Sequence, residues 1–131
     1  MIGLDTNVLL RYVVKDDPTQ FAIAERIIDA AADRGETFVI GDAVLCEFAW
    51  VLARLYRYTH QEIADALDDV VTTAGFHIDR IEEVRAALAE YRTTGADFAD
   101  ALIGRVHRLL GAEHTLTFDR NLKALDSFRV L

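Results

Sequence analysis

The sequence predicts an α/β protein in which a central, mainly parallel sheet of four to five strands lies between two layers of helices. Three observations support this three-layer α/β/α class. Short β-branched and apolar runs alternate with longer segments whose apolar residues recur at helical spacing. Capping residues, one proline and several glycines mark the ends of those longer segments. Strands that alternate with helices favour parallel pairing, right-handed crossovers and helices on both faces of the sheet.

Four segments have the composition of buried strands, and a fifth is a further candidate. They comprise residues 1–5, 37–41, 75–78 and 114–118, with 128–131 as the last one. Each is short, rich in apolar residues and bounded by glycine or polar residues, as expected for strands of a buried parallel sheet.

The helices between these strands begin at residues that favour capping. The expected N-terminal signals are Asp17 before Pro18, Asp42, Thr59 with Glu62, and Asp79 with Glu82. Gly35 and Gly111 are expected to end helices, and Gly95 is expected to break the chain before the last long helix.

Length and composition indicate one domain, residues 1–131, with enough apolar side chains for a substantial core. No apolar run reaches the ~20 residues that span a bilayer, and no secretory signal is expected at the N-terminus. The single cysteine, Cys46, cannot form an internal disulfide and suits a reducing compartment. We therefore expect a soluble cytoplasmic protein that makes no membrane contact.

The net charge of −8 argues against a broad basic surface for non-specific nucleic-acid binding. It leaves room for a local basic rim and for a cluster of acids held together by cations.

Acidic residues follow several of the predicted elements where a ligand would bind. Open parallel sheets bind ligands outside the carboxyl ends of their strands. Asp5 ends the first strand and Asp119 ends the fourth. Glu47 lies early in the helix after the second strand, and Asp97 and Asp100 lie in the first turns of the last long helix. We expect these side chains to meet at one edge of the sheet.

Such a cluster requires a cation. Two carboxylates ~4 Å apart repel by roughly 4 kcal/mol at an effective dielectric constant of ~20. Oxygen ligands without cysteine or paired histidine favour Mg²⁺ or Mn²⁺. These ions activate water and stabilise leaving oxygens in phosphoryl chemistry. The acids therefore indicate metal-dependent chemistry on a phosphate.

Each acid also has a simpler structural explanation. Asp5 in isolation has about even odds of being only a helix N-cap. Asp97 and Asp100 could only favour a helix dipole from a solvated face, and Asp119 could be a turn residue. Glu47 has the weakest alternative of this kind, because its neighbours on both sides are apolar and glutamate is rarely buried unpaired. Their shared predicted edge is what favours a site.

Two other features remain open. Trp50 lies at helical spacing with apolar neighbours, which favours a place in the core or in a dimer interface. The stretch ARLYRY at residues 53–58 is either a solvated helix end or a surface that faces substrate or partner.

Four motifs give the chain a family resemblance, and they are MIGLDTNVLLRYV, VLCEFAWVL, DFADALIG and TLTFDRNL. In this order and at these separations they resemble the PIN-domain ribonucleases, and more narrowly the VapC-type toxins of type II toxin–antitoxin pairs. The resemblance implies a PIN-like fold and a Mg²⁺- or Mn²⁺-dependent endoribonuclease that cleaves cellular RNA (tRNA, rRNA or mRNA) with a metal-activated water.

The resemblance also implies roles for particular residues. Asp5, Glu47, Asp100 and Asp119 would form the catalytic acidic quartet, with Asp97 as an additional metal ligand of second rank. The polar residues that support the acids would be Thr6, Asn7 and Thr117, and the residues that steer the RNA backbone would be Arg11, Arg57 and Arg120. The protein would form a homodimer and be silenced by a cognate antitoxin protein.

Two other functions would use the same features differently. A phosphohydrolase of the haloacid dehalogenase type also has an aspartate after its first strand, but it needs a second one two residues later, where this chain has Asn7. A catalytically silent protein could keep the fold for partner contacts alone.

Overall fold

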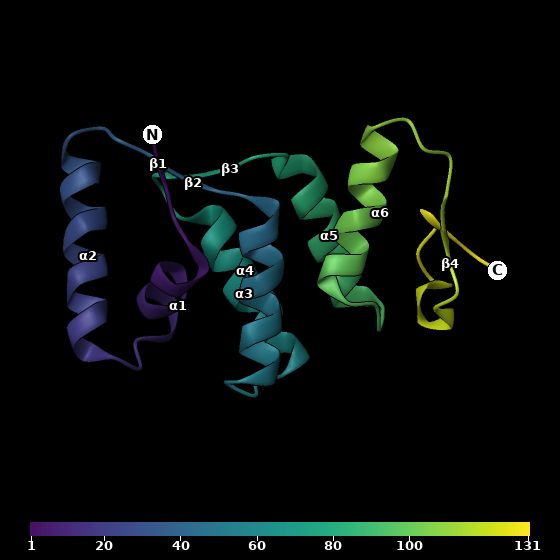
Figure 1. The fold of residues 1–131 in the computed structure, drawn as a ribbon, viewed down its shortest axis with the longest axis horizontal. Helices are drawn as coiled ribbons and strands as arrows, with labels where there is room; N and C mark the ends of the chain where they lie inside the picture. Colours follow the sequence, from purple (N-terminus) through teal and green to yellow (C-terminus); the bar gives the residue numbers. More distant parts are fainter.

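The computed structural model describes residues 1–131, which form six α-helices, one short 3₁₀ helix and five strands (Figure 1). In chain order these are β1 (Ile2–Gly3), α1 (Thr6–Val14), α2 (Pro18–Asp33), β2 (Phe38–Ile40), α3 (Asp42–Arg54), α4 (His60–Thr72), β3 (Phe76–Ile78), α5 (Ile81–Thr93), α6 (Phe98–Leu109), β4 (Thr115–Thr117), η1 (Arg120–Leu122) and β5 (Phe128–Val130). The predicted α/β class is confirmed, and every predicted strand is present in a shorter form.

All strand pairs are parallel, as predicted, but the strands divide between two sheets. The first sheet has the order β1-β2-β3, with Ile2 beside Phe38 and Val39 beside His77. The second consists of β4 and β5 alone, with Thr115 beside Phe128. Since β1, β3, β4 and β5 each pair on one side only, both sheets have two open edges.

Two of the predicted helix starts are confirmed by their hydrogen bonds. The Asp17 carboxylate accepts a bond from the Gln20 backbone N–H at 3.0 Å. Thr59 and Glu62 form a complete capping box, because Thr59 Oγ1 accepts from the Glu62 N–H at 3.1 Å and Glu62 accepts from the Thr59 N–H at 2.9 Å. Both helices therefore begin where the sequence predicts.

The other two predicted caps are wrong. Gly41 occupies the N-cap position of α3, so that Asp42 is the first residue of the helix. The N-cap position of α5 belongs to Arg80, whose backbone is left-handed with φ 54°, and Asp79 makes no capping bond. An ion pair of 2.7 Å between Arg80 and Asp42 joins the starts of these two helices. This long-range contact engages both residues in place of local capping.

The core is built around α3. Its inward face carries Leu45, Phe48 and Leu52, all of which are completely buried. Trp50, in contrast, lies on the outward face with 55% of its surface exposed, which excludes the core position that was one of its two predicted places.

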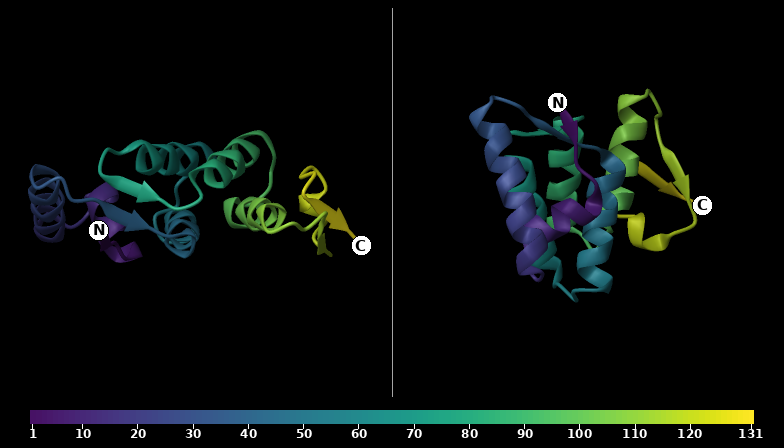
Figure 2. Two further views of the ribbon diagram at one scale, coloured as in Figure 1. Left: turned by 90° about the horizontal axis from the view of Figure 1, so that it is seen from above. Right: turned by 60° about the vertical axis from the view of Figure 1, so that its left-hand side comes forward.

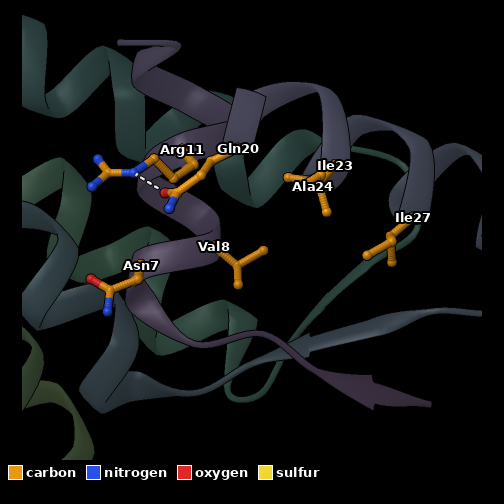
Figure 3. Close-up of a pocket in the computed structure, with 7 residues that line it drawn as sticks. All are labelled: Asn7, Val8, Arg11, Gln20, Ile23, Ala24 and Ile27. Atoms are coloured by element: carbon orange, nitrogen blue, oxygen red, sulfur yellow. Dashed lines mark hydrogen bonds between the residues drawn. The ribbon is translucent and has the colours of Figure 1, made fainter. Parts of the chain in front are cut away.

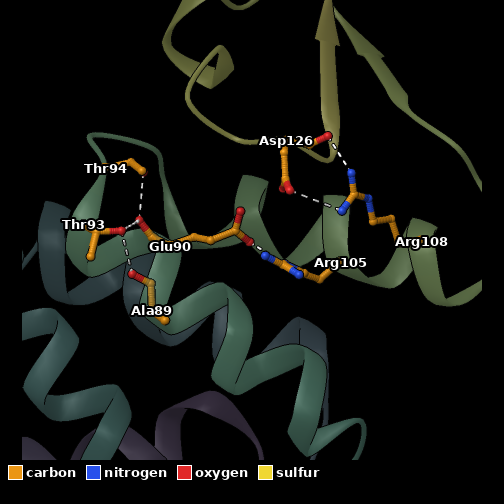
Figure 4. A network of polar contacts seen from close by, with 7 residues as sticks. All are labelled: Ala89, Glu90, Thr93, Thr94, Arg105, Arg108 and Asp126. Atoms are coloured by element: carbon orange, nitrogen blue, oxygen red, sulfur yellow. Dashed lines mark hydrogen bonds and ion pairs between the residues drawn. The ribbon is translucent and has the colours of Figure 1, made fainter.

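The α5–α6 pair and the chain after it form a connected body. We call residues 113–131, which contain β4, η1 and β5, the C-terminal unit. An ion pair of 2.6 Å between Arg105 and Glu90 joins α6 to α5. Arg108 of α6 donates a hydrogen bond of 2.6 Å to the backbone carbonyl of Asp126 and also pairs with its carboxylate (Figure 4). The C-terminal unit is thus attached to α6.

The molecule is elongated in consequence. Helix α2 lies at one end and the C-terminal unit at the other, with α3, α5 and α6 between β1 and β4 (Figures 1 and 2). None of the helices combines the length and the apolar character that crossing a bilayer would require.

Candidate active site

Asp5 lies two residues beyond β1, at the N-cap position of α1. Its side chain makes no capping hydrogen bond, and the carboxylate is exposed. The simplest structural explanation for this residue, a helix cap, is therefore not realised in the fold. The next residue, Thr6, is buried, and Asn7 after it is exposed.

Glu47 faces solvent from α3. Its apolar sequence neighbours include Leu45 and Phe48, which point into the core, while the helical period turns Glu47 to the outward face beside Trp50. It takes part in no hydrogen bond or ion pair. An exposed carboxylate in an apolar run is thus explained by helix geometry, and it stays free to bind a ligand.

Asp97 and Asp100 lie at the start of α6. Asp97 occupies the N-cap position without a capping bond, and Asp100 follows in the first turn. Burial raises the pKa of the Asp100 carboxyl, and the nearby carboxylates of Asp97 and Asp119 raise it further. Three acids from α6 and from the end of β4 therefore act on one another through their charge.

Asp119 lies two residues beyond β4, in the same relation to its strand as Asp5 to β1. Its Oδ1 accepts a hydrogen bond of 2.9 Å from the Asn121 backbone N–H, which is the turn chemistry that the sequence allows. Thr117 Oγ1 accepts a bond of 3.0 Å from the Asp119 N–H. The turn fixes the position of Asp119 and leaves Oδ2 without a partner.

The charges of two candidate acids therefore act on a third. Asp97 and Asp119 raise the pKa of Asp100, whereas neither Asp5 nor Glu47 contributes to that shift, and the predicted quartet stays a prediction. No three carboxylate, histidine or cysteine side chains of one chain form a group ready to hold a metal ion. The donor types nevertheless fit Mg²⁺ or Mn²⁺, because carboxylate oxygens are the ligands these ions prefer.

Asp42 also lies close to this acidic region, although it was not among the predicted site residues. Asp42 lies two residues beyond β2, as Asp5 and Asp119 do beyond their strands, and it was interpreted as a cap. Its Oδ2 pairs with Arg80, but Oδ1 is buried without a hydrogen-bond partner. Burial, followed by the charges of Asp42, Asp97 and Asp100, raises the pKa of Cys46 to about 11. The acidic region thus extends to the first turn of α3.

Arg11, one of the predicted RNA-steering residues, is engaged within the chain. It donates to Gln20 Oε1 at 2.6 Å and to Tyr56 Oη at 2.9 Å, and it pairs with Asp16 at 3.3 Å. Figure 3 shows Arg11 and Gln20 at one side of a groove between α1 and α2, which also holds Val8. The RNA-binding role of Arg11 stays a prediction.

The two other predicted arginines are free of ion pairs. Arg57 is exposed and has a left-handed backbone, with φ 55°, three residues after the end of α3. Arg120 lines an open pocket with Lys123, Phe128 and Val130, next to Asp119. Lys123, which was not among the predicted site residues, lies four residues from Asp119.

Fold and acids together define a class of protein, an α/β domain whose carboxylates follow the carboxyl ends of parallel strands. The sequence matches the PIN domain family over residues 2–127, so the chain belongs to this family and has its three-layer α/β/α fold. PIN domains are generally nucleases, and they typically use divalent metal ions. A comparison with curated proteins finds no significant relative.

Proposed function

We propose that the chain is a Mg²⁺- or Mn²⁺-dependent endoribonuclease and the toxin of a VapC-type toxin–antitoxin pair. One observation beyond family membership carries the proposal. The side-chain carboxylates of the candidate acids Asp5, Glu47, Asp97 and Asp100 take part in no hydrogen bond or ion pair, although these residues lie in or next to helices.

Seven acids elsewhere in the chain pair with arginine, whereas others such as Asp29 do not. Those that form such pairs are Asp16, Glu36, Asp42, Asp65, Asp79, Glu90 and Asp126. No arginine pairs with a candidate acid, so the charge around Asp100 is left for another cation to offset. A divalent metal ion supplies that charge with the oxygen ligands it prefers.

Each predicted residue then has a task in RNA cleavage. Asp5, Glu47, Asp100 and Asp119 would hold the ion, with Asp97 as a further ligand. When bound, the ion supplies an activated water and stabilises the leaving oxygen. Thr117 fixes the turn that carries Asp119, while Thr6 and Asn7 support the region around Asp5. Free arginine and lysine side chains near Asp119 bind RNA phosphates.

The proposed partners follow from charge and exposure. With a net charge of −8, the protein suits an antitoxin whose basic segment covers the acids, in the cytoplasm. A homodimer would cover exposed apolar residues such as Trp50, whose ring has the Arg54 guanidinium 6.0 Å from its centroid.

The test is RNA cleavage by the purified protein with Mg²⁺ or Mn²⁺. We expect cleavage to be lost with a chelator and in Asp5→Asn, and to persist in Asp29→Asn, which removes an exposed acid of α2. Binding of RNA without cleavage would favour a silent PIN-fold protein. Hydrolysis of phosphomonoesters in place of RNA would favour the haloacid dehalogenase alternative.

A further inference from the structure

Four strands of the chain lie at a sheet edge, and two of them, β1 and β4, lead to the candidate acids Asp5 and Asp119. Ile2 and Leu4 donate their backbone N–H groups to β2, so the backbone groups of Gly3 between them face outward. The Thr115 backbone N–H donates to the Ser127 carbonyl, and the Thr117 carbonyl accepts from the Leu131 N–H. The backbone groups of Leu116 therefore face away from β5. Unpaired edges of this kind recruit another strand.

Apolar side chains are exposed along both edges. Ile2 has 40% of its surface exposed, Leu116 has 62% and Phe118 has 83%. Phe118 is more exposed than any other large apolar residue of the chain. Apolar exposure along an unpaired strand indicates that a partner covers it.

The accessible surface of the chain is larger than that expected for a compact monomer, which supports an interface with a partner. A compact monomer of 14.7 kDa is expected to expose about 6,900 Å². The chain exposes 7722 Å². The difference is similar to the ~800 Å² that one partner contributes to a protein–protein interface of standard size.

The edges of β1 and β4 do not meet within one chain. Helices α3, α5 and α6 lie between β1 and β4 in both figures of the fold (Figures 1 and 2). The C-terminal unit is fixed to α6 by the buried Ser127, by the bonds from Arg108 to Asp126 and by a hydrogen bond of 2.9 Å between His107 and Thr115. Movement of the C-terminal unit alone towards β1 would break these contacts, whereas pairing with a second copy requires no such change.

We propose that two copies of this chain pair reciprocally, with β1 of each copy beside β4 of the other, and that Asp119 of the second copy completes each active site next to Asp5. Each copy offers one β1 edge and one β4 edge, so a twofold dimer pairs both of them and closes. The part of the proposal that concerns the active site rests on the proposed nuclease function.

The positions of the two acids agree with this pairing. Both lie two residues beyond the carboxyl end of their strands. Neighbouring strands are about 4.8 Å apart, so parallel pairing in matched register brings both carboxylates to one edge. The arrangement also accounts for the incomplete metal group in a single chain.

Cross-linking tests the pairing without any need for activity. In a Cys46→Ala background, Ile2→Cys protein is mixed with Leu116→Cys protein, subunits are allowed to exchange, and a short bis-maleimide is added. We expect a covalent dimer on a denaturing gel, and none when Ala32→Cys on α2 replaces Leu116→Cys. A third protein carries both cysteines in one chain. A link formed only within single chains of that protein would overturn the proposal. The absence of any link, or an open-ended series of oligomers, would also overturn it.

Complementation tests the shared active site. Asp5→Asn and Asp119→Asn proteins, each inactive, are mixed and allowed to exchange subunits. Each mixed dimer regains one intact site, so about one quarter of the wild-type cleavage rate per chain is expected. No recovery despite the cross-link would show that the sites are not shared. An inactive wild type that still cross-links would refute the nuclease function and leave the dimer standing.

Discussion

Gly104 and Ser127 are in such close contact that a methyl group on residue 104 would overlap the Ser127 hydroxyl. The same methyl group would lie 2.6 Å from a ring carbon of Phe128. Glycine at this position therefore lets the C-terminal unit pack directly on α6, and that packing decides where Asp119 lies.

We therefore expect Gly104→Ala to weaken the attachment of the C-terminal unit. Overpacking of this kind costs about 1–3 kcal/mol in the free energy of unfolding, which urea denaturation measures. Gly95→Ala is the matched control, because nothing lies within 4 Å of the added methyl group there. Equal stability of the two variants would show that this contact is not tight in solution.

Ser127→Ala is expected to leave stability unchanged or to raise it. The Ser127 hydroxyl is completely buried and has no hydrogen-bond partner, so its removal relieves an unsatisfied polar group. Thermal unfolding measures the effect. A loss of more than about 1 kcal/mol would mean that the hydroxyl makes a hydrogen bond in solution.

Thr59→Ala is expected to destabilise the protein by about 0.5–2 kcal/mol, because it removes the Thr59 half of the capping box at the start of α4. Thr59→Ser keeps the hydroxyl and should retain most of the stability. Denaturant unfolding of both variants separates the loss of the capping hydrogen bond from the loss of the rest of the side chain. Equal destabilisation by both substitutions would contradict a stabilising role of the cap.

Lys123→Ala is expected to weaken RNA binding through the pocket that Lys123 shares with Arg120. Loss of one phosphate contact lowers the slope of log affinity against log salt by about 1. The measurement is RNA binding over a series of salt concentrations. Lys15→Ala, which removes a cation 5.2 Å from the Phe21 ring, is the control and should keep the wild-type slope. A wild-type slope in Lys123→Ala would remove this residue from the RNA-binding surface.

Sequence reasoning was most successful where the determining interactions are local. The capping box of Thr59 and Glu62 lies within four consecutive residues, and the helix begins there as predicted. The start of α5 was predicted wrongly because Arg80 bonds to Asp42, which is 38 residues away in the chain. The strands divide between two sheets, and the C-terminal sheet packs on α6 at Gly104, a contact between distant residues that no local pattern encodes.

The same distinction applies to the candidate site. The positions of the acids after strands and at helix starts were predicted, because each depends on a short motif. That they meet at one edge of the sheet was also predicted, and it stays a prediction, since it depends on how the C-terminal unit packs on α6. Asp42 was missed because its place after β2 was read as helix capping, although it matches the places of Asp5 and Asp119 after their strands.

Binding of Mn²⁺, followed by the electron paramagnetic resonance signal of the free ion, tests most directly whether these acids act together on one metal ion. We expect the wild-type protein and Asp29→Asn to bind Mn²⁺ alike. Asp5→Asn and Asp119→Asn should each lose more than the ~10–100-fold in affinity that removal of an outer-shell partner costs. Wild-type affinity in both of these variants, or no binding by the wild-type protein, would contradict a shared metal site.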